Sequence, residues 1–436
     1  MAVVQQIAEK ILAERASPQF LTRSLLDIAA AMLAGGATSE AAKLRAHLVD
    51  DAWGASVPDR VALAVATTRL SEVDDIHLPS CTTPGSIVVP VALIAGAQLG
   101  ASPEVMARAI AAGYRIIMRL GRAVDGPRIL YRGVWPTYLL APVGAAVTAS
   151  VLFGGNGADV AKAMALGLNQ ISGGAGGHVA GLGPRWWLAG QAAAAGVRAA
   201  RAVADGFAAD VSLLDGDWLQ RVHGLAFDRD VALSDADVDM GALSLKPICA
   251  AKQTIAAVDG FRQFLAEGVD PTAIESVRMG VPKDYVAMIG GGGGVASRMG
   301  RMTSVAYQCA LAAYEPALLT DVERVDRSQD PRIAALMAKI SVEHDSALDA
   351  VFPRRWPARV HLRAGATART IEVVEALGDP GRPLENEAFQ RKFMALAAPI
   401  AGKEGAERLF AAGERALLDA AALREFQAGI LTHRRL

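Results

Sequence analysis

The stretch EVDDIHLPSCTTPGSIVVP, residues 72–90, places acids, a histidine and a Pro-Gly turn between two apolar helical patterns. Ionisable side chains between core-forming segments are either solvated at a chain reversal or collected in a cleft, where their pKa values are perturbed. The stretch therefore indicates a cleft site that includes Glu72, Asp74, Asp75 and His77. Ordinary loop chemistry is the alternative, because acids before a Pro-Gly turn are common in loops.

Two glycine-rich runs lie further along the chain. The run Gly290–Gly294 lacks the Lys-Ser/Thr pair of a phosphate-binding loop, so it predicts a mobile loop. The run GGAGGHVAGLG, residues 173–183, follows no predicted strand, which weakens a dinucleotide-binding interpretation. It contains His178, whose imidazole would titrate near neutral pH. His178 is therefore either a solvated loop residue or a candidate for catalysis or substrate binding.

Other candidate side chains are dispersed. Lys246 lies in LSLKPICAAKQT and is either a surface lysine or a site residue. Arg185, beside Trp186 and Trp187, is suited to stacking on an aromatic face or to gripping a carboxylate. The 7 histidines form no HxxxH or HxH pair, and the carboxylates show no calcium-loop spacing. A GxSxG elbow is absent from the sequence as well.

Composition excludes several classes of protein. The 436 residues, 52% of them hydrophobic, can form a large core and predict two domains. The 44 basic and 45 acidic residues nearly cancel, which disfavours nucleic acid and anionic membranes as partners. The 3 cysteines are far apart and predict neither a disulfide framework nor a thiolate zinc site. The charged, amphipathic first 16 residues do not resemble a signal peptide, so we expect a soluble cytoplasmic protein.

Hydrophobic periodicity predicts the elements that must position these residues. Apolar spacing of three and four predicts helices over 1–240, including one from Ser17-Pro18 to Gly35-Gly36 and one from Ser102-Pro103 towards Gly121. Strands are predicted at 274–281, 358–363 and 369–376, the last two as a hairpin. Between them, helical patterns cover 250–267, 303–314 and 330–339, which predicts a small α+β domain over 241–390. The chain returns to helix over 391–436, and Ala- and Gly-rich helices predict a tightly packed bundle and a homodimer.

A series of motifs resembles the MmgE/PrpD family over roughly residues 20–400. In order they are VDDIH with TPGSIVVP, GYRIIMRLGRAV with RGVWPT, RWWLAGQ, LKPICAAKQT, SVAYQCALA, DPRIAALMAKISV and PLENEAFQRKF. The family includes 2-methylcitrate dehydratase, cis-aconitate decarboxylase and iminodisuccinate epimerase. The resemblance implies a mainly α fold: a large helical domain built from both chain ends, a smaller α+β lid, an active site between them and a homodimer. It implies no metal or organic cofactor.

The resemblance also implies roles for individual residues. The family's acidic positions correspond to Glu72, Asp74 and Asp75, and its cleft lysine corresponds to Lys246. A second basic position corresponds to Arg185, and the tyrosine of the SLPY-like motif corresponds to Tyr307. The chain departs from the family at two cleft histidines, which are replaced by the residues Thr83 and Trp135.

Loss of both histidines requires another proton carrier. Dehydration, decarboxylation and epimerisation of such substrates all move a proton at carbon next to a carboxylate, and imidazole suits that task near pH 7. Threonine and tryptophan do not ionise in the useful range. The candidates are Lys246 with a pKa lowered by burial, Tyr307 with a pKa lowered by neighbouring cations, and the imidazoles of His77 and His178. Trp135 would supply an apolar wall, which favours a substrate less charged than a tricarboxylate.

We therefore expect a cofactor-independent lyase, dehydratase in type, acting on a small carboxylate. Arg185 and Lys246 would bind the carboxylate and stabilise an enolate-like intermediate, while Asp74 and Asp75 orient groups in the first loop. The alternatives are an isomerase or epimerase, a decarboxylase, and a binding protein that keeps the fold without catalysis.

Overall fold

The structure is a computed structural model that describes residues 1–436 except 15, 50–54, 173–184, 237, 292–293 and 435–436. The chain forms two compact units. The helical unit is built from Met1–Gly176, Pro184–Leu243 and Phe389–Leu436, and the α+β unit contains Ser244–Ala388. The fold is thus mainly α with a smaller α+β part, as the sequence predicts.

The helical unit contains nearly all of the long helices. Its elements before the α+β unit are α1 (Val3–Ala13), α2 (Pro18–Gly36), α3 (Ser39–Leu48), α4 (Val57–Leu70), β1 (Ile76–His77), α5 (Gly85–Leu99), α6 (Pro103–Ala123), α7 (Gly126–Leu130), α8 (Pro136–Leu152), α9 (Gly157–Leu168), α10 (Arg185–Ala204), α11 (Trp218–His223) and α12 (Arg229–Leu233). Strand β2 (Leu243–Ser244) stands at the boundary between the units. After the α+β unit follow α18 (Asn386–Ala401), α19 (Lys403–Arg415) and α20 (Ala420–Arg434).

Serine-proline pairs begin the two predicted helices. Pro18 and Pro103 each occupy a first helical position, where the missing N–H costs nothing. Ser102 also accepts a hydrogen bond from the amide of Val105 and so caps α6. Both predicted helices are confirmed.

Small residues bring helix backbones close together in this unit. A Cβ on Gly190 of α10 would overlap the carbonyl oxygen of Ala62 in α4, and one on Gly196 would overlap that of Pro142 in α8. Only glycine permits such an approach, which confirms the close helix packing expected from the Ala- and Gly-rich segment.

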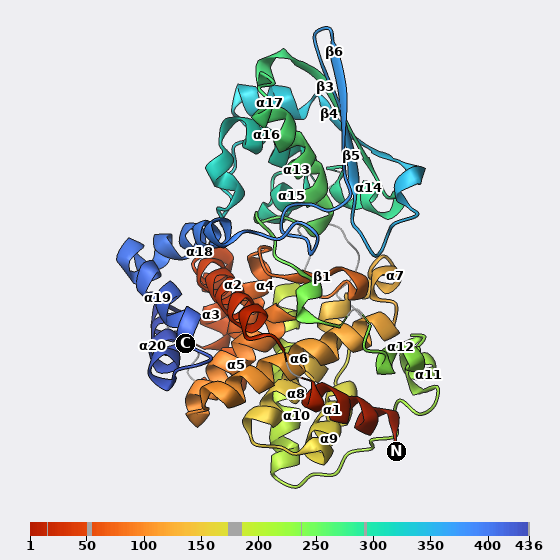
Figure 1. Cartoon of the computed structure of the whole chain (residues 1–436), viewed down its shortest axis with the longest axis vertical. Helices are drawn as coiled ribbons and strands as arrows, with labels where there is room; N and C mark the ends of the chain where they lie inside the picture. The colour runs from red at the N-terminus through yellow and green to blue at the C-terminus, as the bar shows by residue number, and fades with distance from the viewer. Residues whose placement is uncertain (15, 50–54, 173–184, 237, 292–293, 435–436) are drawn as a thin grey trace. The chain divides into compact units, whose positions relative to one another are not determined.

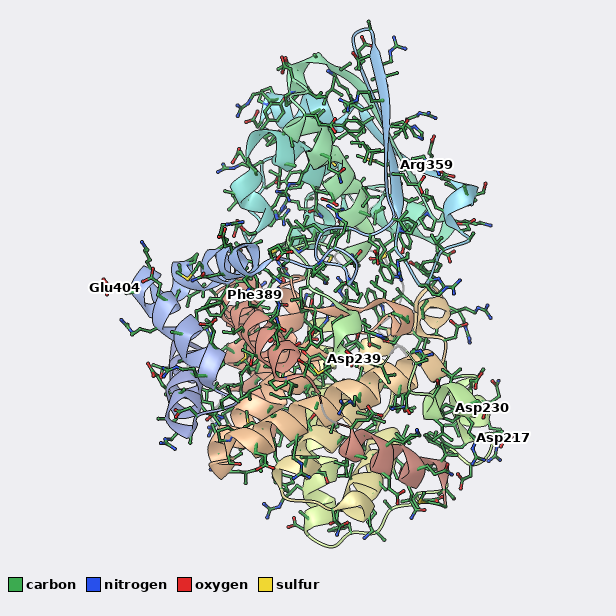
Figure 2. All side chains as sticks on the ribbon, viewed as in Figure 1. Asp217, Asp230, Asp239, Arg359, Phe389 and Glu404 are labelled. Atoms are coloured by element: carbon green, nitrogen blue, oxygen red, sulfur yellow. The ribbon has the colours of Figure 1, made fainter. Side chains whose placement is uncertain are left out.

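The two ends of the chain pack together. In Figure 1 the last helices, α19 and α20, lie beside α2 and α5, and contacts between these elements agree. Phe389, at the start of the returning segment (Figure 2), lies under the guanidinium of Arg23 at 4.4 Å from the ring centroid. Deeper in, Lys392 of α18 pairs with Asp27 of α2 and donates to the carbonyl oxygen of Val73 at 3.2 Å. Both members of this ion pair are buried.

The α+β unit has one four-stranded sheet among its described residues. Its elements are α13 (Lys252–Ala266), β3 (Ile274–Val281), α14 (Val286–Ile289), α15 (Arg298–Thr303), α16 (Val305–Tyr314), α17 (Pro331–Met337), β4 (Ile340–His344), β5 (Ala358–Ala364) and β6 (Thr367–Val373). The strand order is β4-β3-β5-β6, with β4 parallel to β3 and the other pairs antiparallel. The predicted β5–β6 hairpin is confirmed, with Ala358 opposite Val373 and Ala364 opposite Thr367.

Alternation along β5 separates the two faces of this sheet. Val360 and Leu362 are buried, and Val360 lies against Gly260 of α13. On the other face Arg359, labelled in Figure 2, pairs with Asp345 and with Glu372. The sheet is therefore covered by α13 on one face and carries charged side chains on the other.

Over the described part of the chain, no individual helix has both the length and the apolar character to cross a membrane. The helices α2 and α3 meet those two criteria only when taken together, and they are bent by 89° relative to each other.

Candidate functional site

The acidic stretch predicted from the sequence is buried in the helical unit. It follows the last turn of α4, where Arg69 pairs with Asp74 and, at 3.5 Å, with Glu72. Glu72 has a positive φ of 53°, which turns the chain sharply after the helix. Asp74 and Asp75 are fully buried, so the solvated-loop alternative does not hold for them. Burial opposes the charge of Arg69, but Asp74 and Glu72 raise its pKa well above the usual value.

Asp75 is bonded to two other elements of the unit. Its carboxylate accepts hydrogen bonds from the amide of Gly85 at 3.0 Å and from the hydroxyl of Tyr114 in α6 at 2.6 Å. Burial raises the pKa of Asp75 to about 7, although the bonds from Tyr114 and Gly85 favour the charged form. Asp75 is therefore a buried carboxyl group that titrates near neutrality.

The turn that follows is tied to the start of α8. His77 is buried, and its Nδ1 lies 2.8 Å from the hydroxyl of Ser80. Thr83, at one of the expected histidine positions, donates its amide to the hydroxyl of Thr137 at 2.9 Å. Trp135, at the other position, is the N-cap residue of α8. The amide and the hydroxyl of Thr83 both contact Thr137 and so join the two segments in which the resemblance implies histidines.

Arg185, at the start of α10, lies over two indole rings. Its guanidinium carbon is 4.8 Å from the ring centroid of Trp135 and 4.2 Å from that of Trp186, which confirms the predicted stacking. Tyr138 stacks on Trp135 as well, with ring centroids 5.7 Å apart. Arg185 also reaches Glu72 at 3.5 Å, longer than the roughly 2.7–2.9 Å of a charge-assisted hydrogen bond. The helical unit therefore brings Arg185, Trp135 and the acidic stretch together.

Lys246 belongs to the α+β unit and lies on a segment that is fixed by backbone hydrogen bonds. Beside it, the amide of Leu245 donates to the carbonyl oxygen of Gly378 at 2.9 Å, and Ser244 donates to Asp379 at 2.5 Å. Further along, the amide of Cys249 donates to the carbonyl oxygen of Leu319 at 2.8 Å. The lysine thus stands on a firmly positioned stretch of chain.

Tyr307, in α16 of the same unit, differs from the prediction in its electrostatics. Its hydroxyl donates to the carbonyl oxygen of Val325 at 3.0 Å and accepts from the amide of Arg327 at 2.9 Å. Burial raises the pKa of Tyr307, outweighing the cations Arg301 and Arg324. The expectation of a tyrosine pKa lowered by nearby cations is therefore wrong, and a tyrosinate base is disfavoured.

Some predicted and unpredicted residues remain to be placed. His178 lies outside the described residues. A cavity shared by Arg185, Lys246 and Tyr307 stays a prediction. Arg185 belongs to the helical unit, whereas the other two residues belong to the α+β unit. Four further residues of this region were not predicted from the sequence: Arg69, Tyr114, Thr137 and Tyr138. Arg69 carried a readable signal, since it stands three residues before Glu72 at the end of a helix.

The helical unit also contains an apolar surface cavity of about 540 Å³. It is lined by side chains of α4, α5, α8 and α10 and the segment that follows, including Leu99, Phe153, Val197 and Phe207. None of the predicted site residues lines it, so we do not assign the chemistry to this cavity.

Replacement of Gly85 by alanine is expected to destabilise the protein by about 1–3 kcal/mol, the usual effect of overpacking a core. The added Cβ would overlap Tyr114, Asp75 and Ile28, all of them buried. Gly157→Ala is the matched control, because a Cβ there meets nothing within 4 Å. Urea unfolding of both variants measures the difference, and equal midpoints would contradict the close packing described for Gly85.

Comparison with known proteins places the whole arrangement. The MmgE/PrpD N-terminal domain model matches residues 13–225, and the MmgE/PrpD C-terminal domain model matches residues 248–415. A search of curated proteins finds no match to the chain. The two matched segments leave only short stretches uncovered and include every candidate residue except Lys246, which falls in the gap between them. The chain belongs to the MmgE/PrpD family.

Proposed function

We propose that the protein is a cofactor-independent lyase, dehydratase in type, that moves a proton at the carbon next to the carboxylate of a small substrate. Membership of the MmgE/PrpD family supports this class of reaction at the family level. The observation that carries the proposal for this chain is Arg185, whose guanidinium lies over the rings of Trp135 and Trp186 at the edge of the acidic stretch, 3.5 Å from Glu72.

Arg185 is suited to bind the substrate carboxylate. A planar guanidinium that stacks on two aromatic rings is oriented in advance, so little side-chain entropy is lost when it binds an anion. At 3.5 Å the ion pair of Arg185 with Glu72 is longer than a charge-assisted hydrogen bond, and a substrate carboxylate could accept shorter bonds from the same guanidinium. Glu72 also contacts Arg69 at 3.5 Å, so its charge stays compensated during the exchange.

The apolar rings around Arg185 favour a particular substrate. Trp135 and Tyr138 present stacked rings where an imidazole is expected in the family, which replaces a hydrogen-bonding group by an apolar wall. A second or third carboxylate placed against this wall would lose its hydration without a compensating partner. We therefore propose a substrate with fewer carboxylates than a tricarboxylate and with an apolar substituent.

The proposed proton carrier comes from the candidates Lys246, Tyr307, His77 and His178, of which His178 lies outside the described residues. Thr83 and Trp135 cannot ionise near pH 7, and the raised pKa of Tyr307 disfavours it as a base. Lys246, at the position of the family's cleft lysine, is the base that we propose, and the buried His77 is the second candidate. The raised pKa keeps Tyr307 protonated at neutral pH, which suits a hydrogen-bond donor.

Turnover of small carboxylates tests the proposal directly. Purified protein is incubated in deuterated water with 2-methylcitrate, cis-aconitate and hydroxy acids that carry apolar substituents. Loss of water from a hydroxy acid supports the lyase, and deuterium in recovered substrate without loss of water or carbon dioxide would indicate an isomerase instead. Absence of both from folded protein would reject the proposal in favour of a binding protein.

Arg185→Ala is expected to raise KM by about 10- to 100-fold, the range for losing a hydrogen bond to a charged group. Arg185→Lys should fall between this variant and the wild type, since it keeps the charge but loses the planar stacking. Arg198→Lys, an exposed position on the same helix, is the control and should behave as wild type. Steady-state kinetics provide the measurement, and an unchanged KM in Arg185→Ala would exclude this residue from carboxylate binding.

A further inference from the structure

The carboxyl group of Asp75 joins three elements of the helical unit. Asp75 itself follows α4, Gly85 begins α5, and Tyr114 lies in the middle of α6. The Tyr114 hydroxyl donates to Oδ2 at 2.6 Å, while the Gly85 amide donates to Oδ1 at 3.0 Å. All three residues are buried, and Gly85 has no room for a side chain. The position of the α5 N-terminus therefore depends on this carboxyl group and on the tyrosine that holds it.

Two further contacts connect the turn at residues 83–85 with the segment that carries Trp135. Thr83 stands two residues before Gly85, and its amide and hydroxyl lie 2.9 Å and 3.2 Å from the hydroxyl of Thr137. Thr137 is in the first turn of α8, whose N-cap residue is Trp135. A displacement of the turn at residues 83–85 would be transmitted through this contact to Trp135 and so to its stacking on Arg185.

We propose that Tyr114 is a positioning residue of the candidate site, which acts through Asp75 on the turn at residues 83–85 and thereby on Trp135. Tyr114 touches neither Arg185 nor the indoles in any contact described above, so its effect is indirect. The role of Tyr114 in turnover rests on the proposed function. Its effect on the turn at residues 83–85 is independent of that function.

Neighbouring charged groups, together with burial, affect the pKa of Asp75. Asp27 of α2 is paired with Lys392 of α18, and Asp74 is paired with Arg69 of α4. Ser24 of α2 contributes a hydrogen bond to Tyr114. Burial and the two neighbouring aspartates raise the pKa of Asp75 to about 7. Above that pH the carboxylate predominates, and a charged acceptor binds the Gly85 amide about twice as strongly as a neutral one.

Hydrogen exchange of the Gly85 amide tests the proposal without any substrate. In the wild-type full chain, protection corrected for intrinsic exchange should rise on the order of fivefold as pH increases through about 7, the difference between neutral and charged acceptors. In Tyr114→Phe the carboxylate loses a donor, so the rise should move to higher pH. Asp75→Asn should show no rise, because its side chain does not ionise. Tyr285→Phe, a buried tyrosine of the α+β unit, is the matched control and should follow the wild type.

Each result has a defined meaning. Two results would overturn the proposal. One is protection of the wild-type Gly85 amide that does not change across pH 7, and the other is a pH dependence of this protection that is the same in Tyr114→Phe as in the wild type. If Tyr114→Phe does not fold, a rise in Asp75→Asn equal to that of the wild type would overturn the proposal in its place, because Tyr114 is proposed to act through this carboxyl group. With a substrate in hand, Tyr114→Phe should also move the pH profile of kcat/KM in the same direction. A merely structural role would lower the melting temperature without moving that profile. If the Gly85 amide exchanges as expected but the protein turns over no substrate, the positioning role of Tyr114 is supported and the proposed function is rejected.

Discussion

Lys246→Ala should lower kcat by at least about 100-fold on any substrate that the wild type turns over, the lower end of the range for general acid–base catalysis. The reason is chemical, because neither Thr83 nor Trp135 can carry the proton that the family's histidines are expected to move. The segment of Lys246 is held by backbone hydrogen bonds from Leu245 and Cys249, so truncation of the side chain should leave the fold intact. Steady-state kinetics at several pH values, with circular dichroism as a check on folding, measure the effect.

Two further variants make the result specific. Lys283→Ala removes an exposed lysine of the same unit and should keep full activity. Tyr307→Phe removes the donor to Val325 and the acceptor of Arg327, so it should lower stability as well as activity. A Lys246→Ala enzyme with wild-type kcat would show that another group, with His77 first in line, moves the proton.

Lys392→Met should destabilise the helical unit by about 3–5 kcal/mol, the usual effect of removing one partner of a buried ion pair. Methionine fills a similar volume but leaves Asp27 without its cation and Val73 without its donor. Lys403→Met, an exposed lysine of α19, is the control and should change stability little. Urea or thermal unfolding, followed by circular dichroism, gives the difference.

The pH dependence of this loss has a definite sign. Burial raises the pKa of Asp27 even with Lys392 present, and removal of the lysine raises it further. A carboxyl group with a raised folded-state pKa stabilises the protein when protonated, and that contribution is lost as pH rises through the folded-state pKa. The deficit of Lys392→Met should therefore be smaller at pH 5 than at pH 8. The double variant Asp27→Leu/Lys392→Met should recover much of the loss, and a double variant no better than the single one would contradict this account.

Local patterns in the sequence were enough to predict most elements. Strand β3 begins and ends where its β-branched pattern does, and α2 runs from its serine-proline start to its two glycines. Strand β4 was not predicted, because Ile340–His344 directly follows the helical pattern of 330–339 without a turn signal that would mark a new element. Pairing with β3 makes this segment a strand, and that pairing joins residues that are far apart in the chain.

The candidate site was only partly predictable for the same reason. Glu72, Asp74 and Asp75 stand together in the sequence, and Trp186 adjoins Arg185, so their proximity could be read directly. Tyr114 is 39 residues from Asp75 and Lys392 is 365 residues from Asp27, and no single-sequence periodicity relates them. Burial, the largest cause of the raised pKa of Asp75, is produced by elements that are distant in the sequence, which is why the spacing of charges could indicate a site without indicating its electrostatics.

Closure of the helical unit by α18, α19 and α20 has a consequence for the order of folding during synthesis. The growing chain makes α2 and the acidic stretch first, yet the lysine that neutralises Asp27 leaves the ribosome only after the entire α+β unit has been made. Until then Asp27 has no cation from α18, and the face of α2 that α19 and α20 cover stays open to chaperones and proteases. Nascent chains stalled before Phe389 should accordingly be cut more readily in their first helices than the released protein.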